Sequence, residues 1–267
     1  MSKVKYLNDV VANLILSDID CRDYLISIVS KAIGIEEELI KENLTLVSNR
    51  VNENINTKYN YADNVFENNF SIINIEVNYF KGANIEIKNM RYICHLILKQ
   101  TSVGEKYEKL KPIYQININN YDVFKGGKFI YKSILMEESL HQKRSEFMTI
   151  IDINIDFLRD IDYNKLKEED SLEKLLYIFI CDNKMILDKL YLNNRIMDEV
   201  RKKIDNIYKD FDYLLYYDHD EFINECSYEE GERQGIEKIA KTMLEKKMKI
   251  DDITEITGLT KDEIEKL

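Results

Sequence analysis

The sequence predicts an α/β or α+β fold in which a central sheet is flanked by helices. Three observations lead to this prediction. Apolar residues recur at helical spacing near both ends of the chain, and the middle is rich in Ile, Val, Tyr and Phe, with several alternating runs. The chain has 267 residues, 45% of them apolar, which is ample for a packed core. An order of helices, strands with an intervening helix, and helices again is typical of such a core with a helical flank.

Two helices are predicted at the start of the chain, over residues 4–17 and 22–34. Val10, Val11, Leu14 and Ile15 fall at helical spacing in the first, and a similar apolar stripe runs through the second. Gly34 stands where the second helix would stop.

The middle of the chain predicts strands because β-branched and aromatic residues gather there in short runs. The predicted strands are 44–48, 60–66, 70–80, 113–119, 129–136 and 147–155. Glu67-Asn68-Asn69 separates two of these runs and suits a hairpin loop, and Lys125-Gly126-Gly127-Lys128 is interpreted as a second hairpin turn. Between the strands a helix is expected over 84–100, where Met90, Ile93 and Ile97 form an apolar stripe.

Beyond the strands the pattern is helical again, over 171–190 and 194–210. The last forty residues stand apart, because a charged helix pattern over 229–248 is followed by two shorter helical segments. We therefore expect one large domain with a helical flank over 1–225 and a helical tail over 226–267.

The end of this tail has the outline of a helix-turn-helix. Two short helices are predicted around Gly258, and Thr260 with Glu263 forms a capping box that opens the second. A second helix that reads DNA needs basic or amide side chains on its exposed face, whereas this one offers mainly carboxylates and two lysines. These residues favour a tail for packing or self-association over a DNA-reading unit.

The acidic balance of the chain bears on its partners. The 38 basic and 49 acidic side chains give a formal net charge of −11, with Lys and Glu intermixed almost everywhere. Tight non-specific DNA binding is not predicted from charge, because proteins that neutralise phosphates are normally basic over at least one face. An enzyme that recruits a divalent metal to an acidic pocket can still act on nucleic acid, since the ion supplies local positive charge.

The sequence also indicates a compartment. No window approaches the roughly 18 uninterrupted apolar residues of a membrane span, and Asp9 and Asn13 interrupt what would be the apolar region of a secretory signal. The four cysteines lie far apart without a CxxC motif, so they frame neither a zinc site nor a disulfide scaffold. We expect a soluble protein of a reducing cytoplasm, with no membrane partner.

The hairpin predicted over 60–80 carries the candidate chemistry. Alternation along its second strand places Glu76 and Asn78 on one face, and Asp63 lies on the preceding strand. A turn at Glu67-Asn68-Asn69 pairs positions whose numbers sum to about 136, which puts Asp63 a few residues from directly opposite Glu76. Two carboxylates on adjacent strands can converge on one Mg²⁺ or Mn²⁺ ion, which prefers oxygen ligands.

The same run has a plain structural interpretation. An Ile-Asn-Ile-Glu-Val-Asn segment is also what a half-buried strand with one solvated face looks like. On spacing alone, this interpretation is the commoner one.

Five pieces of the chain form an ordered series along nearly its whole length. They are LNDVV at 7–11, NIEVN at 74–78, RY at 91–92, GEKYEKLKPIYQI at 104–116, and a tail with GERQG at 231–235 and ITGLT at 256–260. The series resembles the Rpn-type family of recombination-promoting nucleases, also described as transposases. Asp63 with NIEVN resembles the D-x(n)-(D/E)-x-K core of the PD-(D/E)XK nuclease superfamily, to which that family belongs.

The resemblance implies a PD-(D/E)XK core with a mixed central sheet flanked by helices, and metal-dependent hydrolysis of DNA phosphodiester bonds in mobile-element or recombination biology. Carried over residue by residue, Asp63 and Glu76 would hold Mg²⁺ or Mn²⁺, Asn78 would position the attacking water, and Asp9 would be an accessory acid. Two positions depart from the family pattern, because Ala12 replaces the usual Phe and Asn78 the usual Gln. A neutral amide can orient a water, whereas the Lys of the wider superfamily also stabilises developing negative charge.

Two functions follow from these residues. The first is a metal-dependent DNA endonuclease. The second is a catalytically degenerate protein on the same fold, which uses its C-terminal helices to form a homo-oligomer or to pair with a relative. The acidic net charge and Asn78 favour the second, whereas retention of both carboxylates favours the first, to which we give preference.

Overall fold

The computed structural model describes residues 9–48, 64–79, 81, 84–100, 106–166, 171–181, 183–192, 194–207, 209, 235–246 and 248–264. The chain divides into two compact units, Met1–Ile207 and Tyr208–Leu267. The domain boundary predicted between residues 225 and 226 lies outside the described residues.

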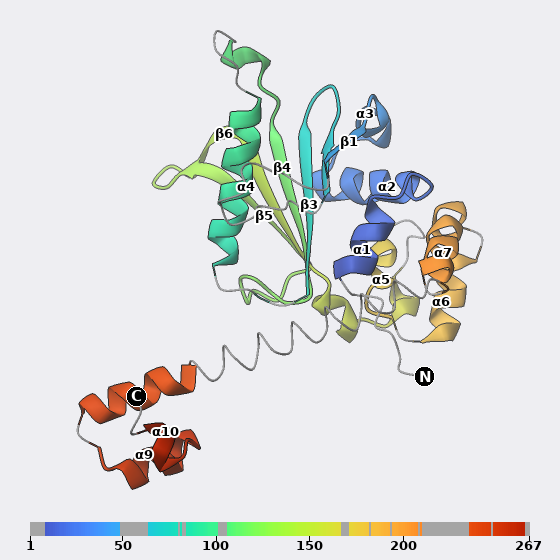
Figure 1. Cartoon of the computed structure of the whole chain (residues 1–267). Coiled ribbons are helices and arrows are strands. Elements are labelled where there is room, and N and C mark those ends of the chain that lie inside the picture. The colour runs from blue at the N-terminus through green and yellow to red at the C-terminus, as the bar shows by residue number, and fades with distance from the viewer. Residues whose placement is uncertain are drawn as a thin grey trace. The chain divides into compact units, whose positions relative to one another are not determined.

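A mixed sheet of six strands forms the centre of the first unit (Figure 1). The strands are β1 (Thr45–Ser48), β2 (Asn64–Glu67), β3 (Ile72–Asn78), β4 (Ile113–Asn119), β5 (Ile130–Glu137) and β6 (Gln142–Asn154). Their order is β1-β2-β3-β4-β6-β5, with β3, β4 and β6 parallel and the other pairs antiparallel. The predictions of an α/β fold and of strands in the middle of the chain are confirmed.

Strand β3 lies inside the sheet and is buried along its whole length. Parallel neighbours need a crossover connection, and the helix α4 (Ile85–Lys99) supplies it between β3 and β4. Because helices then cover both faces of the sheet, a strand of this kind has no solvated face. This burial overturns the interpretation of NIEVN as a strand with one solvated face.

Helix α4 covers one face of the sheet (Figure 1). It shares a buried cluster with three strands, whose members are Val65, Ile72, Ile93, Leu96 and Ile113. The helix itself was predicted correctly, but its predicted stripe is wrong in part. Ile93 is fully buried, whereas Met90 is 43% exposed. The buried side of the helix runs through Asn89 and Tyr92, and Met90 lies off this side.

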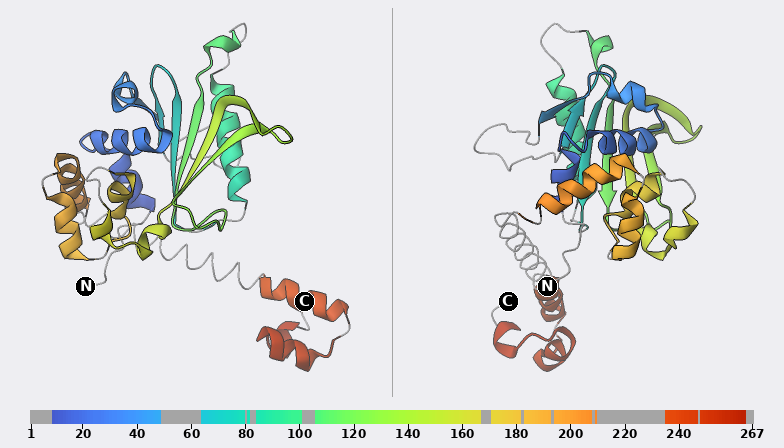
Figure 2. Two further views of the ribbon diagram at one scale, coloured as in Figure 1. Left: turned by 180° about the vertical axis from the view of Figure 1, so that it is seen from behind. Right: turned by 90° about the vertical axis from the view of Figure 1, so that its right-hand side faces the viewer.

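The opposite face of the sheet is apolar and faces helices α1 (Asp9–Leu16) and α2 (Arg22–Ile33) (Figure 2). Asn64 of β2 donates through Nδ2 to Oδ1 of Asn13 in α1, at 2.8 Å. Gly34 ends α2 in the left-handed conformation, with φ of 84°, so the predicted end of this helix is confirmed.

Two predictions about connections are wrong. The helix expected over 171–190 is two helices, α5 (Leu172–Tyr177) and α6 (Lys184–Tyr191). Residues 125–128 do not turn a hairpin, because β6 lies between β4 and β5, and the hairpin instead joins β5 to β6. The remaining described elements of this unit are α3 (Glu37–Lys41), α7 (Arg195–Ile207) and 3-10 helices at Tyr107–Lys109, Asp156–Asp160 and Tyr163–Lys165.

The second unit has its own small core. It contains a helix over 235–245, then α9 (Ile250–Thr257) and α10 (Lys261–Ile264). Its buried cluster consists of Ala240, Ile253, Leu259 and Ile264. The capping box is confirmed, because Thr260 N–H donates to Glu263 Oε2 at 2.9 Å and Glu263 N–H donates to Thr260 Oγ1 at 3.4 Å.

Within the described ranges, no helix combines the length and the apolar character needed to cross a membrane. Cys21, Cys94 and Cys181 are free thiols, in keeping with the prediction that cysteines build no disulfide scaffold there. Cys226 lies outside the described residues.

Candidate functional site

The structure brings together two of the four predicted site residues. Glu76 and Asn78 both lie on β3, on the face that α4 covers, and their exposed fractions are 0% and 7%. Asp63 lies outside the described residues. Asp9 begins helix α1, but its side chain is likewise outside what the structure describes.

The register of the β2–β3 hairpin differs from the predicted one. Asn64 pairs with Ile75 and Val65 with Asn74, so paired positions sum to 139 rather than about 136. The turn is longer than predicted, because Asn68 Oδ1 accepts hydrogen bonds from the backbone N–H groups of Phe70 and Ser71, both at 2.8 Å. The side chain of Asn68 thereby fixes a connection that composition alone does not reveal.

Glu76 is fully buried, so its carboxylate needs partners inside the protein. A carboxylate that is removed from water must be paired or hydrogen-bonded, because an isolated buried charge is very unfavourable. Here Lys88 of α4 places its ammonium 3.1 Å from Glu76 Oε2, and Asn74 donates through Nδ2 to Oε1 at 3.3 Å. Both oxygens of the buried carboxylate therefore have donors.

Lys88 is a site residue that sequence analysis missed. Its side chain is 42% exposed, so the ammonium connects the buried carboxylate with the surface of the protein. Its Nζ atom also lies 5.5 Å from the centroid of the Tyr92 ring, one helical turn further along α4. The sequence does contain a signal for Lys88, because it precedes Tyr92 by four residues. This spacing places Lys88 on the same side of the helix as the buried Tyr92.

Polar side chains continue across the sheet from Glu76. In-register pairing aligns Glu76 with Asn117 and Asn117 with Asp152, and it aligns Asn78 with Asn119 in the same way. We call the connected set the amide ladder. It consists of Asn74, Glu76 and Asn78 on β3, Gln115, Asn117 and Asn119 on β4, and Asp152 on β6.

One arm of the ladder joins Glu76 to Asp152. Asn74 Nδ2 donates to Gln115 Oε1 at 2.7 Å, and Gln115 Nε2 donates to Asn117 Oδ1 at 2.9 Å. Asn117 Nδ2 then donates to Asp152 Oδ1 at 2.9 Å. Every side chain in this arm is buried, so these hydrogen bonds satisfy groups that water does not reach.

A second arm joins Asn78 to the same oxygen. Asn78 Nδ2 donates to Asn119 Oδ1 at 3.0 Å, and Asn119 Nδ2 donates to Asp152 Oδ1 at 3.1 Å. Asp152 is thus the meeting point of both arms, and sequence analysis did not single it out. The ladder lies toward the carboxyl ends of parallel strands, which is where open α/β sheets commonly form their sites.

Burial raises the pKa of Asp152 above its ordinary value of 3.8. The amide hydrogen bonds from Asn117 and Asn119 act in the opposite direction, and the negative charge of Glu86 adds to the rise. Burial outweighs the hydrogen bonds, so Asp152 holds its proton more tightly than an exposed aspartate.

The chemistry of the donors fits a hard cation in type but not in number. Glu76 supplies a carboxylate, and the buried Oδ1 atom of Asn74 has no hydrogen-bond partner within the described part of the chain. In that same part, no three His, Cys, Asp or Glu side chains gather as metal ligands. Asp152 is two strands away from Glu76, roughly 10 Å by strand spacing, and Asn117 lies between them.

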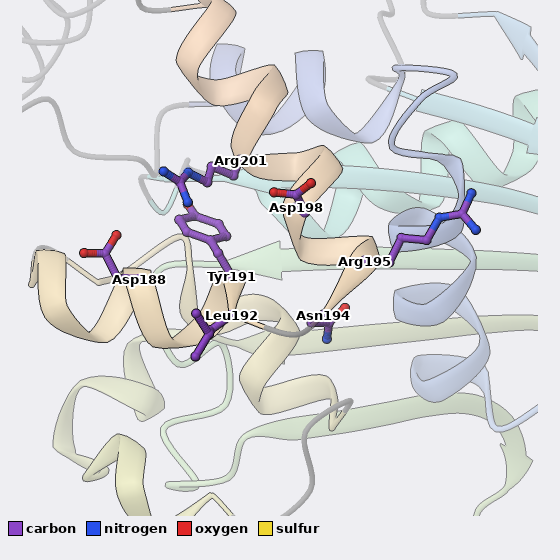
Figure 3. Close-up of a pocket in the computed structure, with 7 residues that line it drawn as sticks. All are labelled: Asp188, Tyr191, Leu192, Asn194, Arg195, Asp198 and Arg201. Atoms are coloured by element: carbon purple, nitrogen blue, oxygen red, sulfur yellow. The ribbon is translucent and has the colours of Figure 1, made fainter.

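A separate pocket lies on the helical flank, between α6 and α7 (Figure 3). Its lining consists of Asp188, Tyr191, Leu192, Asn194, Arg195, Asp198 and Arg201. Arg201 stacks over Tyr191, with 5.7 Å from its guanidinium carbon to the ring centroid, and Asp198 pairs with Lys202 at 3.0 Å. Because two arginines and two aspartates face the same opening, its charge favours no particular ligand.

Comparison with protein families gives a match at the C-terminal end of the given sequence. Residues 233–267 match a family model described as "Rpn/YhgA-like nuclease family, C-terminal HTH domain". No curated protein and no solved structure gives a significant match to the chain. The match supports similarity of this C-terminal part of the chain to that family, and it agrees with the helix-turn-helix outline predicted for the end of the tail.

Proposed function

We propose that this protein is a metal-dependent DNA endonuclease whose reaction centre lies at Glu76. The observation that carries the proposal is a fully buried carboxylate, set near the carboxyl end of a parallel strand and paired with the partly exposed Lys88. The match to a nuclease family supports the reaction class. A PD-(D/E)XK core and a role in recombination or mobile-element biology belong to the same proposal.

Glu76 and Asp63 are the proposed ligands of Mg²⁺ or Mn²⁺. Asp63 directly precedes Asn64, which pairs with Ile75, the neighbour of Glu76. A divalent ion bound there supplies two effects, a lowered pKa of the attacking water and compensation of charge on a phosphate oxygen. Asp9, from the first helix, is the proposed accessory acid.

Lys88 and Asn78 divide the work that one lysine performs in the wider superfamily. Asn78, two residues after Glu76 on the same face, orients the attacking water through hydrogen bonding. The ammonium of Lys88 reaches Glu76 from α4 and stabilises negative charge that develops on the phosphate. The absence of a lysine at position 78 is then not an argument against catalysis.

The second unit is the proposed DNA-binding part. Exposed lysines within its described helical part, residues 235–246 and 248–264, offer phosphate contacts, at positions 238, 241, 246, 249 and 261. Lys261, at the start of α10, forms an ion pair with Asp251 of α9, which reduces its availability. We expect modest, salt-dependent affinity for DNA, in keeping with the net charge of −11.

The test is a nicking assay on supercoiled DNA with the full chain, in Mg²⁺, in Mn²⁺ and in EDTA. We expect cleavage only with a divalent ion, no cleavage by Glu76→Gln, and roughly 10²-fold slower cleavage by Lys88→Met. Lys109→Met, at an exposed lysine outside the site, is the matched control and retains full activity. Calorimetric titration of Mg²⁺ with and without a short duplex, against the double variant Asp63→Ala/Glu76→Ala, tests the ligands directly. Full activity of Glu76→Gln would exclude this reaction centre.

The incomplete ligand set among the described residues favours one second candidate, a degenerate nuclease fold that acts as an interaction module. It predicts no cleavage with any divalent ion and a change of oligomeric state when residues 228–267 are removed. Size-exclusion chromatography with light scattering measures that change, and a truncated protein with an unchanged oligomeric state speaks against it.

A further inference from the structure

We propose that Asp152 is a positioning residue, whose Oδ1 atom sets the orientation of both amide arms and thereby of the groups at Glu76 and Asn78. This inference rests on the proposed function for its catalytic meaning, but the arrangement of the arms is testable without any reaction.

The argument starts from the two-sided chemistry of an amide. Asn and Gln side chains carry a donor on one side and an acceptor on the other, so a chain of them can run in either direction. A carboxylate oxygen that receives two amide groups can only accept. Asp152 Oδ1 receives both Asn117 Nδ2 and Asn119 Nδ2, so one end of each arm has a defined direction.

That direction propagates along the first arm. Asn117 turns its Nδ2 to Asp152, so its Oδ1 faces Gln115 and must accept from Nε2. Gln115 then turns its Oε1 to Asn74, which must present Nδ2. The same Nδ2 group has a second hydrogen, and this one points to Glu76 Oε1. Reversal of the arm would instead turn an amide oxygen toward the buried carboxylate, which is repulsive.

The second arm gives the corresponding result at Asn78. Asn119 turns its Nδ2 to Asp152, so its Oδ1 accepts from Asn78 Nδ2. The amide oxygen of Asn78 is then the atom that remains to accept a hydrogen bond from a water. One oxygen on β6 therefore selects a donor beside Glu76 and an acceptor for the attacking water at Asn78.

Burial is what makes this selection effective. Asn74, Gln115, Asn117 and Asn119 are each at most 1% exposed, so no solvent competes to stabilise a reversed amide. In such an environment an unmatched donor or acceptor costs its full desolvation penalty. The amides of one arm therefore reverse together or not at all. Asp152 excludes the reversed state in both arms, and in the first arm Glu76 does so as well.

The experiment compares Asp152→Leu, which has no acceptor, with Asp152→Asn, which retains one. Slow exchange of the side-chain amide hydrogens of Asn74 and Asn78 is measured by ¹⁵N–¹H correlation NMR of the full chain. We expect Asp152→Leu to accelerate both by at least about 10-fold, and Asp152→Asn to leave both slow. Asn154→Leu is the matched control, since it makes the same kind of change at a buried residue of the same strand and lies outside the ladder.

A second variant keeps the inference testable if Asp152→Leu does not fold. Gln115→Met interrupts only the first arm, so it should release the amide hydrogens of Asn74 and leave those of Asn78 protected. In the nicking assay, Asp152→Leu should lower kcat by about 10- to 100-fold with little change in KM, with recovery in Asp152→Asn.

The outcomes separate the two proposals. Unchanged exchange in both Asp152→Leu and Gln115→Met would overturn the inference, even if Glu76-dependent cleavage is found. Loss of kcat in Asp152→Asn as well as in Asp152→Leu would also overturn it, because the charge and not the acceptor would then matter. Faster exchange in Asp152→Leu, together with a wild-type protein that does not cleave DNA, would support the ladder and reject the nuclease.

Discussion

At the scale of single residues, two buried carboxylates are stabilised in different ways. Glu76 is paired with the ammonium of Lys88, whereas the donors to Asp152 in the described part of the chain are neutral amides. An amide hydrogen bond stabilises a carboxylate less than an ion pair does, so burial dominates at Asp152 and its pKa is raised. Burial thus shifts the protonation of Asp152 to higher pH than that of an exposed aspartate.

The raised pKa of Asp152 predicts a pH-dependent contribution to stability. An acid whose folded-state pKa exceeds its unfolded value contributes stability that is fully present below the unfolded value and is lost as pH rises through the folded one. For Asp152 the loss begins near 3.8 and extends upward. The variant Asp152→Asn, which does not titrate, should therefore gain stability relative to wild type as pH rises through this window.

Urea denaturation of both proteins at a series of pH values measures this difference in the free energy of unfolding. Asn154→Asp, on the same strand, controls for the general effect of a carboxylate at the end of β6. A difference between wild type and Asp152→Asn that does not change with pH would contradict the assignment.

At the scale of secondary-structure elements, α4 serves both the core and the site. Its Ile93 and Leu96 pack into the apolar cluster with β3 and β4. Lys88, nearer the start of the helix, reaches Glu76 on the same face of the sheet. One helix thus carries apolar contacts along one part and the ionic contact along another, so a shift of α4 would move the core and the site together.

This dual role predicts a contrast between two positions of α4. Ile93→Ala removes a fully buried side chain and should lower the free energy of unfolding by about 2–5 kcal/mol. Met90→Ala, at a side chain that is 43% exposed, should change it by no more than about 0.5 kcal/mol. Chemical denaturation measures both values, and similar losses at the two positions would contradict the observed face of the helix.

At the scale of the whole molecule, the chain combines two units that have separate cores. The first has the central sheet, and the second buries Ala240, Ile253, Leu259 and Ile264 among its own helices. Since each unit buries its apolar residues internally, neither core requires the other. Under the proposed function, the first unit carries the reaction centre and the second unit binds DNA.

Separate cores predict separate unfolding. Ile253→Ala, at a side chain that is 0% exposed, should lower the melting temperature of the second unit and leave that of the first unchanged. Ile256→Ala, in the same helix but 59% exposed, is the matched control and should alter neither. Differential scanning calorimetry of the full chain distinguishes the two transitions, and a parallel shift of both by Ile253→Ala would show that the units unfold together.

The sequence alone determined what depends on local interactions. The strand 113–119, the end of α2 at Gly34 and the capping box of Thr260 with Glu263 were all predicted correctly. Each is decided by side chains a few residues apart, through alternation, a left-handed residue or reciprocal capping. Alternation likewise placed Glu76 and Asn78 on one face of β3.

Only the tertiary structure decided what depends on distant partners. The sequence did not show that β6 lies between β4 and β5, nor that the Asn68 side chain shifts the hairpin register. Nor did it join Lys88 and Asp152 to the site, since they lie on a helix and on a strand far along the chain. Periodicity states which side of a strand a residue occupies, but the element that covers that side is chosen by packing of the whole sheet. That packing turned a strand with an expected solvated face into the buried ladder around Glu76.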